Sequence, residues 1–151
     1  MSLNKNNNIE LEKRRQKILQ HYESPVNKLK NKNKYLDYSS VNENSPSCID
    51  NLTIYTKIKN NKIVDIVFDG IGCVISTSST DMMIEQIKNK TINEGMKIID
   101  EYLKMIYKKK YDAKKINDLV VFENVNKQLN RIKCATIGIE AIKKSIVKVK
   151  K

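Results

Sequence analysis

Apolar and polar residues alternate along residues 52–59, and this is the clearest pattern in the chain. A second apolar run covers residues 63–68, and two turn-forming residues, Asn60 and Asn61, separate the two runs. Period-two alternation is typical of a β-strand with one buried face, and a short polar break between two such runs is typical of a hairpin. The pattern therefore predicts an antiparallel β-hairpin.

Apolar residues spaced three and four positions apart predict helices in other parts of the chain. The expected helices cover residues 9–22, 76–88, 94–110 and 124–132, and a final one starts near Cys134. A Ser-Pro pair should end the first helix, and Ser76 or Thr77 is available to cap the second. Residues 1–8 are rich in Asn and Lys and are expected to be disordered, while residues 35–38 are a candidate edge strand.

The expected strands come early in the chain and most of the expected helices come late. This order predicts an α+β fold, in which helices pack on one face of a small antiparallel sheet. A chain of 151 residues fits one domain of common size, so we expect a single domain over residues 1–151.

The chain is strongly basic, with 29 Lys and Arg residues against 17 Asp and Glu residues and a net charge of +12. Such a balance ordinarily suggests an anionic partner such as nucleic acid. Only Arg14, Arg15 and Arg131 are arginines, however, and base and phosphate recognition favours the bidentate guanidinium group. We therefore do not expect specific nucleic-acid binding, and attraction to an acidic protein surface stays open.

The first thirty residues carry Lys, Asn and Glu where a secretory signal needs an apolar core. No apolar run approaches the length of a membrane span either, so we expect a cytoplasmic protein that does not enter a membrane. In a reducing cytosol, three cysteines are more readily metal ligands or reactive thiols than disulfide partners. Buried and inert cysteines remain the alternative.

Three cysteines and one aspartate form the candidate chemical site. Cys48 lies on a predicted loop, and Asp50 follows two residues later. Cys73 follows two glycines just before a predicted helix, and Cys134 lies at the expected first turn of another helix, where the positive helix end favours a thiolate. Three sulfurs and a carboxylate match the four donors of a tetrahedral zinc ion. Spacing alone is a weak signal, because the chain has no Cys-x-x-Cys pair, and it leaves a metal site and a reactive-thiol site both open.

The segments around these residues resemble the three cysteine motifs of the NifU/IscU iron-sulfur scaffold superfamily. They are residues 45–50 (Ser-Pro-Ser-Cys-Ile-Asp), residues 68–76 (Phe-Asp-Gly-Ile-Gly-Cys-Val-Ile-Ser) with Met82-Met83 beyond them, and residues 131–136 (Arg-Ile-Lys-Cys-Ala-Thr). His21-Tyr22 with Pro25 and Asn27 is similar to the His-Tyr-x-x-Pro-Arg-Asn opening of that family. The resemblance spans roughly residues 9–147 and implies a SufE/NifU-like fold.

Two features resemble the SufU type of this superfamily rather than the IscU type. The IscU type carries a histidine directly before its third cysteine, and this chain has Lys133 there. Residues 91–118 resemble the insertion that distinguishes the SufU type. The chain departs from the family pattern at Val26, where arginine is usual and partner docking could change, and at Ile49, where glycine is common and the loop carrying Cys48 could be stiffer.

The SufU resemblance implies a zinc-dependent sulfurtransferase that works with a SufS-type cysteine desulfurase, a pyridoxal-phosphate enzyme. The zinc ligands carried over from the resemblance are Cys48, Asp50, Cys73 and Cys134. In SufU-like proteins the first cysteine leaves zinc when a partner histidine takes its place, so Cys48 would be the catalytic acceptor of persulfide sulfur. Downstream iron-sulfur assembly proteins would then receive the sulfur.

Two other functions stay open at this point. One is a scaffold that assembles a [2Fe-2S] cluster, or binds iron, on the same ligands. The other is a structural zinc domain that binds RNA through its basic surface. The lone histidine, His21, could be a ligand or a base, but local packing near a helix C-terminus is the favoured interpretation. Arg131 could orient the donors beside Cys134 or simply lie on the surface.

Overall fold

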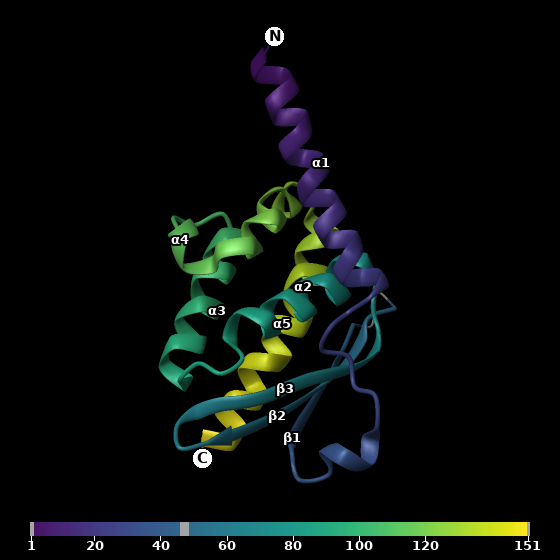
Figure 1. Ribbon diagram of the computed structural model, residues 1–151, viewed down its shortest axis with the longest axis vertical. Coiled ribbons are helices and arrows are strands. Elements are labelled where there is room, and N and C mark those ends of the chain that lie inside the picture. The colour runs from purple at the N-terminus through teal and green to yellow at the C-terminus, as the bar shows by residue number, and fades with distance from the viewer. Residues whose placement is uncertain (1, 46–48, 151) are drawn as a thin grey trace.

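The computed structural model describes residues 2–45 and 49–150 of the chain. In chain order its elements are α1 (Ser2–Glu23), the 3-10 segment η1 (Lys32–Tyr35), β1 (Ser39–Asn44), β2 (Asn51–Lys59), β3 (Lys62–Ile71), α2 (Val74–Ile87), α3 (Ile92–Ile106), α4 (Ala113–Ile116), the 3-10 segment η2 (Asn117–Lys127) and α5 (Leu129–Lys150). Figure 1 shows the sheet at one end of the molecule and the first turns of α1 extending beyond the other end.

The predicted hairpin is confirmed as β2 and β3, which pair antiparallel in a sheet of order β1-β2-β3. Asn60 and Asn61 have φ angles of 53° and 62°, as a two-residue type I′ turn requires, and asparagine accepts this left-handed backbone more readily than most residues. The alternation of β2 places Leu52 and Ile54 in the core, where both are fully buried. The sequence pattern therefore located both strands and the turn between them.

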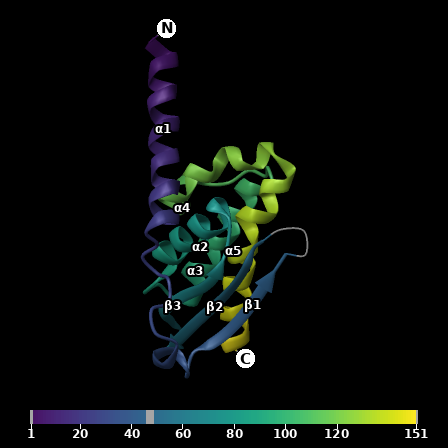
Figure 2. The same cartoon turned by 90° about the vertical axis from the view of Figure 1, so that its right-hand side faces the viewer.

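Helices pack on one face of this sheet, so the predicted α+β fold is confirmed. Helix α5 packs against β1 and β2, and α2 and α3 pack against β3. Figure 2 shows α5 running alongside the strands. At this interface the hydroxyl groups of Thr56 on β2 and Ser145 on α5 share a buried hydrogen bond of 2.6 Å. None of the helices in the described ranges is long and apolar enough to cross a membrane.

Helix α2 lies among the other helices and is buried on nearly all sides, although much of it is polar. Its buried polar residues are Ser76, Thr77, Ser78, Ser79, Thr80 and Asp81. The hydroxyl groups of Ser78, Ser79 and Thr80 donate to backbone carbonyls about one turn back, so these buried donors are satisfied inside the helix. Small polar side chains therefore let neighbouring helices approach α2 closely.

The approach is tightest where α5 crosses α2 at Gly138. A Cβ atom on Gly138 would lie 1.8 Å from Thr80 Oγ1, so even a methyl group does not fit. We expect Gly138→Ala to lower the free energy of unfolding by about 1–3 kcal/mol, the usual cost of overpacking a core, as measured by urea denaturation. Thr80→Ala removes the nearest atom, so the double variant should recover part of that loss. Strict additivity of the two substitutions would contradict this contact.

Two boundaries near the N-terminus differ from the prediction. Helix α1 begins at Ser2 and so includes residues that were expected to be disordered. The candidate edge strand at residues 35–38 is wrong, because η1 ends at Tyr35, a turn follows over residues 36–38, and the edge strand β1 begins only at Ser39. The sequence of β1 is Ser-Ser-Val-Asn-Glu-Asn, and a single apolar residue gives no alternation by which to find a strand.

Of the two helices expected over residues 94–110 and 124–132, the structure has the first but not the second. The short helix expected over residues 124–132 is wrong, because η2 ends at Lys127 and α5 already begins at Leu129. The amphipathic helix expected over residues 94–110 is confirmed as α3, which ends four residues earlier. Thr91 caps α3 in a capping box, and this signal could have located its start.

Candidate metal centre

Three of the four predicted donors lie together. The ligand atoms of Asp50, Cys73 and Cys134 are all within 4.8 Å of one another. Asp50 directly precedes β2, Cys73 lies two residues after β3, and Cys134 lies on α5, so the fold brings together segments that are far apart in sequence. Asp50 and Cys134 are buried and Cys73 is partly exposed. Cys48, the fourth predicted donor, lies outside the described residues.

Gly70 allows β3 to lead directly into this site. Its φ is +117°, a value that residues with a side chain rarely adopt. Gly70 lies opposite Leu52 in the ladder, and a Cβ atom on it would lie 2.1 Å from the carbonyl oxygen of Asn51. Because glycine has no Cβ atom, the end of β3 can lie against the start of β2. Cys73 therefore comes next to Asp50.

Cys73 is the N-cap residue of α2. Its Sγ accepts a hydrogen bond from the backbone N–H of Ser76 at 3.4 Å. The expectation that Ser76 or Thr77 caps this helix is therefore wrong, because α2 begins at Val74. The Cys73 sulfur lies at the N-terminal end of the helix, as predicted.

Cys134 lies in the second turn of α5 rather than in its first turn. The helix begins at Leu129, and the thiol of Cys134 donates to the carbonyl oxygen of Asn130 at 3.8 Å. The prediction that Cys134 lies in the first turn, at the positive end of the helix, is therefore wrong. The packing of α5 against α2 and β2 determines where the sulfur lies.

The Asp50 carboxylate is held by the start of α2. Its Oδ1 accepts hydrogen bonds from the backbone N–H of Cys73 and from the hydroxyl of Ser76, both at 2.8 Å. Asp50 is 2% exposed and Ser76 is fully buried, so water competes little for these hydrogen bonds. Sequence analysis missed the role of Ser76. Its place three residues after Cys73, at a helix start, is the signal that could have revealed it.

The described donor set fits a zinc ion. Two cysteine sulfurs and a carboxylate oxygen are donors that zinc accepts, and a closed structural site usually has four of them. Hydrogen bonds to a coordinating carboxylate are also common in metal sites, because they orient the ligand. The hydrogen bonds to Asp50 Oδ1 match this arrangement. Hard cations such as Mg²⁺ and Ca²⁺ prefer all-oxygen sites, so two sulfurs disfavour them.

His21 contacts a different part of α2. Its Nδ1 lies 2.6 Å from Oδ2 of Asp81, which is fully buried. The backbone N–H groups of Val26 and Asn27 also donate to the Asp81 carboxylate, at 3.2 and 2.8 Å. Local packing was the favoured prediction for His21, and the partner is instead 60 residues away in sequence. The contact between His21 and Asp81 connects the end of α1 to α2.

Two basic residues near Cys134 lie on the surface. Arg131 is exposed, and its Nε donates to Oε1 of Gln128 at 3.1 Å. Lys133, which occupies the position of the IscU-type histidine, is also exposed. Of the two interpretations of Arg131, the described contacts favour the surface one.

The chain is similar in sequence to known iron-sulfur assembly proteins. The family model of the NifU-like N terminal domain matches residues 13–135. The chain is 33% identical over 135 residues to the zinc-dependent sulfurtransferase SufU of Bacillus subtilis, and the alignment covers 89% of each protein. It is 29% identical over 103 residues to the iron-sulfur cluster assembly scaffold protein IscU of Thermotoga maritima, which covers 68% of this chain and 72% of that protein.

The fold of the chain is also similar to the folds of solved structures of this kind. A candidate iron-sulfur cluster assembly scaffold protein for the SUF system, from Fervidobacterium islandicum, superposes with a TM-score of 0.77 at 28% identity, over 86% of this chain and 93% of that one. A NifU-like N-terminal protein from Brucella abortus superposes with a TM-score of 0.74 over 89% and 92% of the two chains. At 17% identity the second likeness shows the fold alone. The predicted SufE/NifU-like fold is therefore confirmed by its SufU and NifU-like structural neighbours.

Proposed function

Because the chain belongs to the family of NifU-like N-terminal domains, we propose that it serves iron-sulfur cluster assembly as a zinc-dependent sulfurtransferase. The observation that carries this proposal is the convergence of the ligand atoms of Asp50, Cys73 and Cys134 to within 4.8 Å. Similarity to a SufU protein along 89% of the chain supports a sulfurtransferase activity over the scaffold role that other relatives have. Residues 1–151 would form one domain, with residues 91–118 as its insertion.

Zinc would be held by Asp50, Cys73 and Cys134 together with Cys48. When bound, zinc stabilises thiolates and has no redox chemistry of its own, so it would not oxidise a persulfide. The Cys73 N–H and the Ser76 hydroxyl would keep the carboxylate in its ligating orientation, because both donate to Asp50 Oδ1. Burial of Asp50 and Cys134 would keep water away from two of the donors.

Cys48 would be the sulfur acceptor. Its thiolate would attack the outer sulfur of the persulfide on the desulfurase, forming a new S–S bond while the original S–S bond breaks. The partner's cysteine would leave as a thiolate, and Cys48 would carry the persulfide, so no external oxidant or reductant is needed. Cys73 and Cys134 would remain with the metal, since each is fixed at or within a long helix.

The partner would be a SufS-type cysteine desulfurase, and downstream iron-sulfur assembly proteins would receive the sulfur. Two large apolar side chains next to the donors, Ile49 and Ile71, are each 68% exposed. Exposed apolar side chains beside a reactive site support contact with a protein partner. The cytoplasm keeps cysteine thiols reduced, so a site built from metal-binding and sulfur-accepting cysteines supports a cytoplasmic location.

Substitution of Cys48 tests the acceptor role. Cys48→Ala should lose stimulation of the cognate desulfurase, because no thiolate remains to take the sulfur, while the three other donors still bind zinc. The measurements are sulfide or alanine release by the desulfurase and zinc content per chain. Normal stimulation by Cys48→Ala would show that the assigned role is wrong.

A [2Fe-2S] scaffold on the same ligands is the second candidate, and the similarity to IscU of Thermotoga maritima favours it. The two functions differ in the protein as purified. Zinc near one per chain without visible colour supports the sulfurtransferase. A brown protein with acid-labile sulfide, in which iron replaces zinc, supports the scaffold.

RNA binding through the lysines should disappear as salt is added, because counterion release dominates such binding.

A further inference from the structure

A groove of about 640 Å³ runs along α1 beside the candidate metal centre. Its other walls are the first turn of α2, the segment η2 and the start of α5. The residues that α1 contributes are Leu11, Arg14, Arg15, Ile18 and Leu19. They follow the i, i+3, i+4, i+7, i+8 spacing of one helix face. One face of α1, from Leu11 to Leu19, thus lines the groove.

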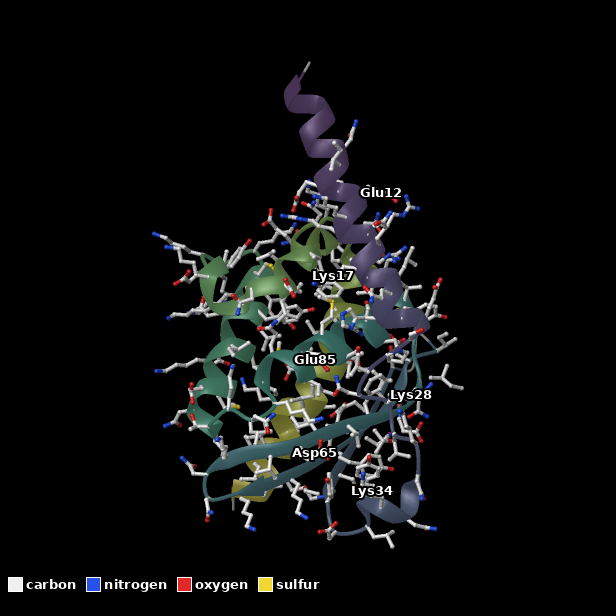
Figure 3. The ribbon with its side chains drawn as sticks, in the orientation of Figure 1. Glu12, Lys17, Lys28, Lys34, Asp65 and Glu85 are labelled. Carbon is white, nitrogen blue, oxygen red and sulfur yellow. The ribbon has the colours of Figure 1, made fainter. Side chains whose placement is uncertain are left out.

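The floor of the groove is apolar and incompletely covered. Val74 of α2 and the partly buried Val121 and Val125 of η2 lie across from α1. Leu11 and Leu19 remain 50% and 38% exposed on the α1 side. Lys17 of α1 is not among the residues that line the groove. It pairs with an aspartate of η2, and Figure 3 shows it over the helical body rather than on the outer side of α1. Contiguous exposed apolar surface of this kind marks binding sites.

The rim of the groove is cationic, and arginine supplies all of the charge. The chain has 29 basic residues, yet its three arginines, Arg14, Arg15 and Arg131, all line this groove. No lysine in the described ranges lines it. A guanidinium group presents paired donors that match a carboxylate, whereas a lysine ammonium does not. In so lysine-rich a chain, this distribution favours recognition of an anionic group by paired donors, such as a carboxylate, over general positive charge.

Arg14 has hydrogen-bonding capacity that the described residues do not use. Its Nε is buried and has no hydrogen-bond partner among them, although it forms an ion pair with Oε1 of the exposed Glu10 at 3.5 Å. Buried donors nearly always have an acceptor in folded proteins. Nε of Arg131, by contrast, already donates to Gln128. An acceptor from outside the chain would satisfy Arg14.

We propose that this groove binds an amphipathic helix of a partner protein, with aliphatic side chains against Val74, Val121 and Val125 and with Asp or Glu residues along its edges. The arginine rim selects the acidic edges by charge complementarity. A helix fits because α1 itself presents ridges at helical spacing, into which a second helix can pack. The interface is independent of the chemistry at the donors, although Val74 directly follows Cys73 and the bound helix would lie beside the metal centre.

A designed peptide tests this surface on the full chain loaded with zinc. The probe is a fluorescein-labelled helical peptide of about 18 residues, with leucines at i, i+3, i+4 and i+7 and glutamates on both flanks. Fluorescence anisotropy measures its Kd. Replacing the three groove arginines together with glutamine should raise the Kd about tenfold or more. Replacing them with lysine should also raise the Kd, because the charge remains but the paired donors are lost.

The control carries the same change in net charge at a distant place. Lys59, Lys62 and Lys97 are exposed, lie outside the groove lining and can be replaced together with glutamine. This variant should bind the peptide nearly as well as the unchanged protein. Equal weakening by the two glutamine variants, or equal binding of a peptide with lysine in place of glutamate, would overturn the proposal.

A second measurement locates the peptide. In methyl-labelled protein, titration should shift the NMR signals of Ile18, Val74, Val121 and Val125, which line the groove. The signals of Ile63 and Ile66, which are fully buried in the sheet, should stay in place. Shifts confined to residues outside the groove would also overturn the proposal. Circular dichroism and zinc content show in parallel that each variant is folded and loaded.

Discussion

Cys134→Ala is expected to lose bound zinc and, with it, much of the stability of the domain. Cys134 is buried on α5, and its sulfur is one of only two described sulfurs at the site. Because zinc bound to the native state adds its binding free energy to folding, a thousandfold weaker affinity lowers the free energy of unfolding by about 4 kcal/mol. The measurements are zinc per chain after dialysis and urea denaturation at fixed free zinc.

Two controls separate metal loss from damage to α5. Thr136→Ala removes a buried hydroxyl two residues away, which within the described part of the chain donates to carbonyls of the preceding turn. That variant should keep its zinc. With a chelator present, the unchanged protein should lose most of its stability advantage over Cys134→Ala. One tightly held zinc per chain in Cys134→Ala would contradict the site.

Asp81→Ala is expected to be the most destabilising substitution away from the metal centre. The Asp81 carboxylate is fully buried and accepts hydrogen bonds from the backbone N–H of Asn27, from its side-chain amide and from the N–H of Val26, and it contacts His21. Removing it takes the acceptor away from the backbone N–H groups of Val26 and Asn27 and leaves His21 without its buried partner, which costs on the order of 3–5 kcal/mol. Urea denaturation measures the loss, and limited proteolysis should cut the released connection after α1.

The matched control is another aspartate that pairs with α1. Asp118 of η2 binds Lys17 at 2.8 Å, but both side chains are substantially exposed. Asp118→Ala should therefore change the free energy of unfolding by no more than about 1 kcal/mol. If the two aspartate variants were equally stable, Asp81 would not connect α1 to α2 in the way its hydrogen bonds indicate.

The elements with a regular apolar period could be predicted from the sequence. The hairpin was located because its alternation is unbroken and Asn60-Asn61 suits a tight turn. Helix α3 was located because apolar residues recur along one face. Segment η2 was not predicted, because a 3-10 helix does not follow the 3.6-residue period. The start of α5 was missed for a related reason, since its first turn, Leu129–Ile132, is largely exposed and shows no apolar stripe.

The donor residues of the candidate site could be predicted from the sequence, but the residues that hold them in place could not. Residue chemistry and family resemblance together pointed to Asp50, Cys73 and Cys134, and the fold brings them together. The sequence gives no direct sign that Ser76 donates to Asp50, because the two residues are adjacent only after β3 returns beside β2. The contact between His21 and Asp81 was equally hidden, since hydrogen bonds between distant polar residues leave no periodic pattern.

Zinc K-edge X-ray absorption on the zinc-loaded full chain tests the central claim most directly. Coordination by Cys48, Asp50, Cys73 and Cys134 predicts three sulfurs at about 2.3 Å and one oxygen at about 2.0–2.2 Å. In Cys48→Ala the sulfur count should fall to two while the oxygen contribution stays. A shell with four sulfurs, or one without any sulfur, would contradict the account.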